Sequence, residues 1–229
     1  MTSAELSVVK AGVPAAKLIR TPYGTSFSYL DSYLSSSLPP ISTTLPKSKL
    51  PVDCHRGTLP AFFAGLLPEG PRLEALARQA QTVTDDHFSL LQRVGVDVIG
   101  DVQVIESGQP AINRQSAVFM DPRKPQIRDL QELAEHEMAG ALPGMQGKIS
   151  AQRLHARAKG KNEVFILKFE QTNFPHLVSN EAYIMKLAKD CGLRVAENEV
   201  VFETGRQLLK VRRFDRIAST AGVARLAVE

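Results

Sequence analysis

Residues 163–170 read Glu-Val-Phe-Ile-Leu-Lys-Phe-Glu, and the predicted fold rests chiefly on this segment. Four consecutive apolar residues, Val164 to Leu167, are typical of a buried strand, which is expected to span Glu163–Glu170. Lys168 follows them directly and so emerges at the edge of the core, where an ammonium group needs an anion nearby. A charged residue at a strand end gives the same pattern, so the lysine alone does not define a site.

The segments around this strand complete a small lobe of four strands and one helix. A helix is expected at about Ser179–Cys191, with Ser179 as its cap, an apolar stripe containing Tyr183, Ile184 and Leu187, and Glu181 in its first turn. The other strands are expected at Gly147–Arg157, Glu199–Glu203 and Gln207–Arg212. The order strand, strand ending in lysine, helix with a glutamate, strand, strand is that of a protein-kinase small lobe.

The first half of the chain indicates a subdomain of its own. Strands are expected at Leu6–Val9, Ala15–Arg20, Ser26–Leu30 and Gly100–Ile105, and helices at Leu59–Leu67, from Pro71, and from Asp85 or Asp86 to Gly95. Residues 107–126, with several glycines and prolines, are expected to be a linker. We therefore expect an α+β chain with two domains: a docking subdomain, 1–110, and a kinase-like small lobe with an antiparallel sheet and one helix, 127–229.

Composition excludes several classes of protein. The 229 residues are 43% hydrophobic and 23% charged, unlike a disordered tail or a fibre. No apolar run reaches the roughly 18 residues of a membrane span, and the N-terminus lacks the features of a signal peptide. The two cysteines, Cys54 and Cys191, are far apart and are expected to be reduced thiols. The expected compartment is the cytoplasm, without a membrane partner.

The net charge of +4 comes from the second half of the chain. This surplus fits a phosphate-bearing ligand or nucleic acid, and it fits a solvated surface equally well. The basic residues Lys148, Arg153, Arg157, Lys159 and Lys161 leave the same two alternatives open, because no aromatic residues are interleaved with them. The five histidines are not at metal-ligand spacing, so no metal site is expected.

Phosphoryl transfer requires that phosphates be positioned and that their charge be offset. In a kinase small lobe a glycine-containing turn, a strand lysine and a helix glutamate do this. The candidates here are Gly144, Met145, Gln146, Gly147 and Lys148 in the turn, then Lys168, then Glu181. Each has a structural alternative: an ordinary loop, a charge at a strand end, and an acid that complements the helix dipole.

Taken together, these motifs resemble the HipA-like serine/threonine kinases, the toxins of HipBA-type toxin–antitoxin pairs. The resembling segments are Gly144–Lys148 (the G-x-Q-x-K phosphate loop), Phe165–Lys168 (the strand ending in the ATP-contacting lysine), Asn180-Glu181 (the N-E pair), Val211–Arg216 (the V-x-R-F-D-R hinge) and Phe62–Gly70 (the F-F-x-N-L-L-P-[DE] segment). The motifs occur in the family's order and cover most of the chain.

The resemblance implies that the longer protein transfers the ATP γ-phosphate to a serine of a protein target, an aminoacyl-tRNA synthetase being the family precedent. It also implies restraint by a DNA-binding antitoxin of the HipB type, through which DNA is reached indirectly. Within this chain, Gly144–Lys148 would cradle the phosphates, Lys168 would contact them and Glu181 would orient Lys168. The backbone of Arg212, Arg213 and Phe214 would meet adenine.

Two departures from the family pattern change these expectations. Ala141, Leu142 and Pro143 stand where many members carry a serine that is phosphorylated by the kinase itself. The family's catalytic and metal-binding aspartates lie in a large lobe after the hinge, whereas this chain ends at Glu229. We therefore expect a truncated chain with no catalytic residues, weak ATP binding, Mg²⁺ only in the full-length protein, and no phosphoryl transfer. The alternative is a non-catalytic module that docks an antitoxin or a partner kinase chain.

Overall fold

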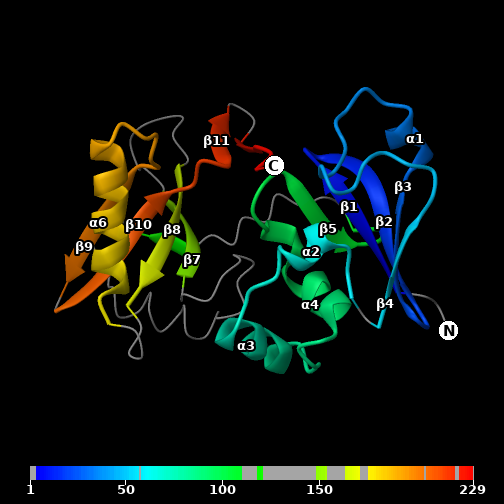
Figure 1. Cartoon of the computed structure of the whole chain (residues 1–229), viewed down its shortest axis with the longest axis horizontal. Helices are drawn as coiled ribbons and strands as arrows, with labels where there is room; N and C mark the ends of the chain where they lie inside the picture. Colours follow the sequence, from blue (N-terminus) through cyan, green and yellow to red (C-terminus); the bar gives the residue numbers. More distant parts are fainter. Residues whose placement is uncertain are drawn as a thin grey trace. The chain divides into compact units, whose positions relative to one another are not determined.

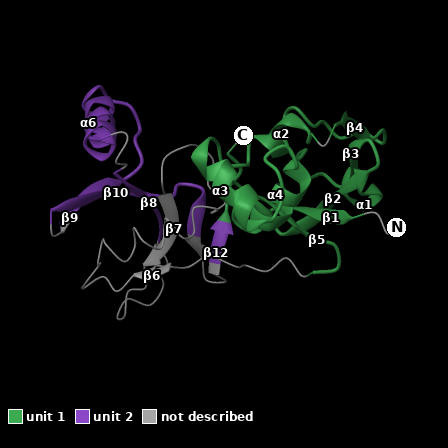
Figure 2. Cartoon of the chain, turned by 90° about the horizontal axis from the view of Figure 1, so that it is seen from below, with its two compact units in different colours: residues 1–114, 141–145, 225–229 green, residues 115–140, 146–224 purple. Residues whose placement is uncertain are grey.

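The computed structural model describes residues 4–56, 58–109, 118–120, 148–153, 163–170, 175–203, 205–219 and 222–228. The chain divides into two compact units (Figure 2). Unit 1 comprises residues 1–114, 141–145 and 225–229, and unit 2 comprises residues 115–140 and 146–224. Each unit combines a five-stranded sheet with helical segments (Figure 1), so the predicted α+β class is confirmed. None of the helices within the described ranges is long and apolar enough to cross a membrane.

Unit 1 is built on an antiparallel sheet of strand order β4-β3-β2-β1-β5. Its strands are β1 (Glu5–Lys10), β2 (Val13–Thr21), β3 (Gly24–Tyr29), β4 (Val52–His55) and β5 (Val102–Glu106). Leu6, Val8 and Leu18 are buried from β1 and β2. Gly24 is required by a close approach of two strands, because a Cβ atom there would lie 1.9 Å from the carbonyl oxygen of Cys54.

The helices of unit 1 are short and bury their apolar residues in the core. They are α1 (Asp31–Leu34), α2 (Ala61–Ala64), α3 (Pro71–Gln79), α4 (His87–Val94) and a 3₁₀ turn at Gly95–Asp97. The helix expected at Leu59–Leu67 is only the four residues of α2, since Pro60 stands at its N-cap and Gly65 at its C-cap. Phe63 and Leu67 are nevertheless buried, as their apolar character predicts.

Asp86 caps α4, as the sequence indicates. Its carboxylate accepts the backbone N–H of Ser89 at 3.2 Å and the Thr82 hydroxyl at 2.9 Å, and it pairs with Arg20 at 2.5 Å. Burial opposes ionisation, but these hydrogen bonds outweigh it and hold the pKa of Asp86 below its usual value.

Replacing Asp86 with Ala should lower the free energy of unfolding by about 1–2 kcal/mol at pH 7. Since the folded-state pKa is lowered, the carboxylate stabilises the fold above its unfolded-state pKa of 3.8. This contribution is lost as the pH falls through the folded-state value. Urea unfolding of both proteins from pH 7 to pH 2 should therefore show the difference shrinking in acid. Asp85→Ala, at the exposed neighbouring position, is the control; an equal loss in both variants would contradict the assignment.

Unit 2 contains a sheet of order β6-β7-β8-β10-β9. Its strands are β6 (Val118–Met120), β7 (Lys148–Arg153), β8 (Glu163–Phe169), β9 (Asn198–Glu203) and β10 (Arg206–Arg212). The expectation of an antiparallel sheet was wrong at one edge, because β6 pairs with β7 in parallel. Strand β6 also lies in the segment expected to be a linker. A two-stranded sheet of β11 (Arg216–Ser219) and β12 (Gly222–Arg225) follows.

Helix α6 (Leu177–Asp190) packs on one face of the unit 2 sheet (Figure 1). Its buried residue Val178 contacts Leu209 and Val211 of β10, and Ala182 and Met185 pack against the same cluster. The predicted apolar stripe was wrong, because Tyr183, Ile184 and Leu187 are 64%, 52% and 47% exposed. The helix begins two residues earlier than predicted, which places Glu181 beyond its first turn.

Candidate functional site

Lys168 and Glu181, which are 13 residues apart in sequence, form an ion pair between β8 and α6. Lys168 lies opposite Leu209 in the β8–β10 register, and paired residues share a face of a sheet. Because Leu209 is buried in the cluster with α6, Lys168 lies on the face that the helix covers. Glu181 follows the core residue Val178 by three positions on the helix, which brings its carboxylate to this face. The lysine side chain is 19% exposed, so it remains accessible to a ligand.

Strand β7 brings the end of the predicted phosphate loop to the same place. Lys148 is the first residue of β7 and lies directly opposite Lys168 in the antiparallel register. Residues 144–147 lie outside the described part of the chain.

Glu170 holds the beginning of α6, a role that the sequence did not reveal. Its carboxylate accepts the backbone N–H groups of Leu177 and Val178 at 3.1 and 3.2 Å, and the side-chain amide of Gln207 at 2.6 Å. Ser179, the predicted cap, lies inside the helix and accepts a hydrogen bond from Gln207. The correct cap comes from the end of β8, so Glu170 connects the strand of Lys168 to the helix of Glu181.

Glu170→Ala should destabilise unit 2 by about 1–2 kcal/mol, since it leaves two N–H groups of α6 without their acceptor. Hydrogen exchange should quicken at Leu177 and Val178 before it changes elsewhere in α6. Glu199→Ala is the matched control, because its carboxylate is largely exposed on β9. Unchanged exchange at the start of α6 would show that Glu170 does not cap the helix.

The predicted adenine-contacting residues continue from the end of β10. The backbone N–H groups of Arg212 and Arg213 donate to the carbonyl oxygens of Glu197 and Val164, both at 2.8 Å. The Arg213 side chain is buried, whereas Phe214 is 62% exposed. Arg212 lies opposite Phe165, three residues along β8 from Lys168. At about 3.3 Å per residue the two points are ~10 Å apart along the sheet, the scale of a nucleotide.

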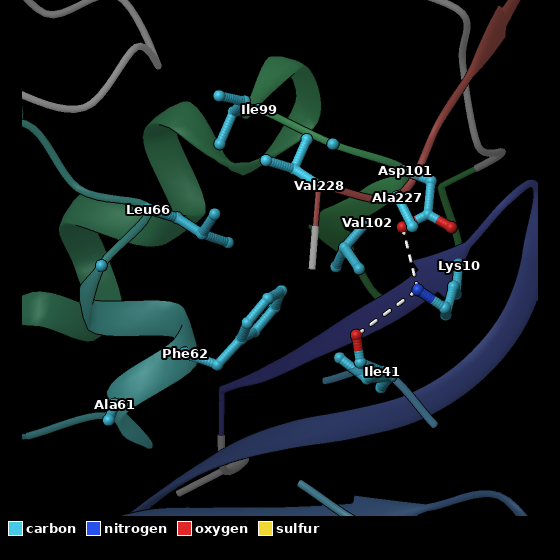
Figure 3. A pocket seen from close by; sticks show the side chains of 12 residues that line it. Lys10, Ile41, Ala61, Phe62, Leu66, Ile99, Asp101, Val102, Ala227 and Val228 are labelled. Atoms are coloured by element: carbon cyan, nitrogen blue, oxygen red, sulfur yellow. Dashed lines mark hydrogen bonds and ion pairs between the residues drawn. The ribbon is translucent and has the colours of Figure 1, made fainter. Parts of the chain in front are cut away.

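A cavity of about 290 Å³ lies in unit 1, and none of these residues lines it (Figure 3). Phe62 and Leu66 contribute to its apolar wall, and Lys10 lines it from β1. The Lys10 ammonium donates to Asp101 at 2.9 Å and to the carbonyl oxygen of Ile41 at 3.4 Å. Within the described ranges, no group of histidine, cysteine or acidic side chains could hold a metal ion. Among the described residues, the candidate site around Lys168 therefore gains no residue from the cavity and no metal ligand.

Two family models match the chain in sequence. Residues 6–105 match the HipA N-terminal domain, and residues 140–229 match the HipA-like C-terminal domain. The chain belongs to the HipA family. This confirms the resemblance drawn from the motifs, and the two matched regions fall in the two halves that the motifs distinguish.

Curated relatives agree with this assignment. The putative kinase Y4mE of Sinorhizobium fredii is 30% identical over 214 residues, covering 86% of this chain and 50% of the relative. The serine/threonine-protein kinase toxin HipA of Shewanella oneidensis is 27% identical over 187 residues, covering 77% and 42%. The chain spans about half the length of the curated relatives it matches.

A solved HipA structure shares the fold. It is that of the Shewanella oneidensis MR-1 toxin–antitoxin complex of HipA, HipB and operator DNA, with a TM-score of 0.64 and 20% identity. The similarity covers 96% of this chain and 53% of that chain. The HipA-like order of elements is thus present along nearly the whole sequence.

Proposed function

We propose that this protein is an ATP-dependent serine/threonine kinase of the HipA type, and that residues 1–229 supply its N-terminal subdomain and its nucleotide-binding small lobe. The observation that carries the proposal is the ion pair of Lys168 and Glu181, with the start of β7 opposite Lys168. Phosphoryl transfer depends on positioned positive charge, and a lysine held by a helix glutamate supplies it.

Each residue has a definite task in this proposal. Lys168 offsets the charge of the ATP phosphates, and Glu181 keeps the ammonium group directed at them. Gly144, Met145, Gln146, Gly147 and Lys148 form the loop over the phosphates, and Arg212, Arg213 and Phe214 form the adenine side. The Lys168 ammonium group is partly exposed, so water screens its attraction for the phosphates. ATP binding to these residues alone is therefore weak. No residue of this chain is assigned to Mg²⁺.

Titration of the 229-residue chain with ATP tests nucleotide binding. Amide NMR signals of β7, β8 and the hinge should shift with a millimolar dissociation constant, about 4 kcal/mol. Transfer of labelled γ-phosphate to a protein serine should then be measured on the full-length gene product. Absence of ATP-dependent shifts would contradict the proposal.

We propose an antitoxin of the HipB type as partner, with DNA reached through it and a protein serine as substrate. The support is the HipA relative solved with HipB and operator DNA. Co-purification of this chain with a HipB-type antitoxin tests the partnership. A chain that binds this partner but gives no ATP-dependent shifts would be the alternative, a non-catalytic binding module.

A further inference from the structure

Arg213, Asp215 and Arg216 form a buried charge cluster just after β10. Arg213 donates from Nε and from a terminal nitrogen to the two carboxylate oxygens of Asp215, at 2.9 and 2.7 Å. Arg216 donates to the same carboxylate at 2.6 Å and to the Asp215 carbonyl oxygen at 3.0 Å. All three side chains are at most 3% exposed. One carboxylate therefore holds two guanidinium groups within four consecutive residues.

Such a cluster is poorly explained by stability alone. Removing charged groups from water costs several kcal/mol for each ion, and well-packed apolar residues often stabilise a fold as much. What planar, bidentate ion pairs do provide is a fixed geometry. Asp215 binds the side chain of Arg213, which precedes it in sequence, and that of Arg216, which follows it. The ion pairs therefore also fix the backbone from residue 213 to residue 216.

The cluster constrains the backbone on both sides of Phe214. Arg213 and Asp215 are directed inward, and Phe214 between them is directed outward. The N–H groups of Arg212 and Arg213 already have carbonyl acceptors. Among the described residues, we find no acceptor for the N–H group of Phe214. This N–H is thus a donor held at a set position in an exposed turn.

We propose that Asp215 is a positioning residue that makes the hinge select adenine over guanine. The inference rests on the proposed ATP binding. The Watson–Crick edge of adenine pairs an acceptor, N1, with a donor, the 6-amino group, whereas guanine presents N1–H and an acceptor, O6. The Phe214 N–H, held in place, can donate to N1 of adenine, whereas it opposes the N1–H donor of guanine. Discrimination of this kind depends on rigid placement, because a movable hinge can adjust to either base.

The test compares ATP and GTP titrations of the 229-residue chain and of Asp215→Asn, followed by NMR. Asparagine keeps the size of the side chain but removes the charge that holds two arginines. We expect the ratio of ATP to GTP affinity to fall at least threefold, with GTP affinity nearly unchanged. Asp190→Asn is the matched control, since the same substitution at the exposed end of α6 leaves the hinge intact.

The possible results separate this inference from the proposed function. An unchanged ATP-to-GTP ratio in Asp215→Asn, or an equal loss of both affinities, overturns the inference alone. A wild-type chain that binds neither nucleotide overturns the proposed function and the inference with it. Should Asp215→Asn fail to fold, Arg216→Lys replaces it, because lysine keeps the buried charge but not the planar fork. The same threefold fall in the ratio is then expected, and its absence counts against the inference.

Discussion

Replacing Lys168 with Met is expected to abolish ATP-dependent NMR shifts around the start of β7 while leaving the thermal stability of the chain nearly unchanged. Methionine keeps an apolar stem against the core edge but removes the charge that the phosphates would contact. Loss of the lysine charge leaves the Glu181 carboxylate without its ion-pair partner, yet the Glu181 side chain is 31% exposed and can be hydrated. The stability cost should therefore stay within about 1 kcal/mol.

Lys210→Met is the matched control for Lys168→Met. Lys210 pairs in register with Leu167, so it lies on the opposite face of the same sheet, where its ammonium group stacks on Phe165 at 4.4 Å from the ring centre. The Lys210→Met substitution removes an identical charge and should leave the ATP-dependent NMR shifts unchanged. If Lys168→Met unfolds unit 2, or if its ATP shifts persist, Lys168 is structural and the kinase assignment loses its central residue.

Strands β8, β9 and β10 of unit 2 could be predicted because their signals are local. The apolar run Val164–Leu167 predicts a strand that begins at Glu163, and β8 does begin there. The predicted outer ends of the β9–β10 hairpin agree with the structure to within one residue. The pairing of Lys168 with Glu181 was expected from the kinase small-lobe pattern and from the resemblance to the HipA-like kinases. The strand positions, in contrast, depend on neighbours in sequence, which is the information a single chain carries.

Helix α6 shows where such reasoning fails. Tyr183, Ile184 and Leu187 have helical spacing, yet smaller residues, Val178 and Ala182, face the sheet. Ser179 has the residue type of a cap, but the acceptor comes from Glu170 through the tertiary fold. The spacing of apolar residues predicts a helix but not which of its faces packs against the sheet. Residue type predicts a cap only when the capping residue is a neighbour in sequence.

Charges buried by tertiary contacts were equally hidden. The sequence Arg213-Phe214-Asp215-Arg216 was interpreted as a hinge, and nothing in its composition indicates that its three charged side chains are enclosed. Lys10 and Asp101 are 91 residues apart, and each looks like an ordinary surface residue. Their pairing follows from β1 lying beside β5, which is a property of the assembled sheet.

Asp101→Ala should therefore have the largest effect on stability in unit 1, lowering its free energy of unfolding by about 3–5 kcal/mol. The Lys10 side chain is 7% exposed, so without Asp101 its ammonium group keeps, within the described part of the chain, only the longer contact with the carbonyl oxygen of Ile41. Urea unfolding followed by tyrosine fluorescence reports mainly on this unit, since three of the four tyrosines, Tyr23, Tyr29 and Tyr33, lie within it and the fourth, Tyr183, is exposed on α6. Asp53→Ala, at an exposed position of β4, should change the same value by no more than about 0.5 kcal/mol.

The double variant Lys10→Met/Asp101→Leu separates the two causes of such a loss. If the unpaired buried charge is responsible, replacing both partners with apolar residues should recover most of the stability, because no ion is then left without water or a partner. The apolar wall of the cavity beside Lys10 can accommodate the new side chains (Figure 3). A double variant as unstable as Asp101→Ala would instead assign the loss to packing around Asp101. An Asp101→Ala chain within about 1 kcal/mol of the wild type would show that water reaches Lys10, and that the pair does not hold β1 against β5.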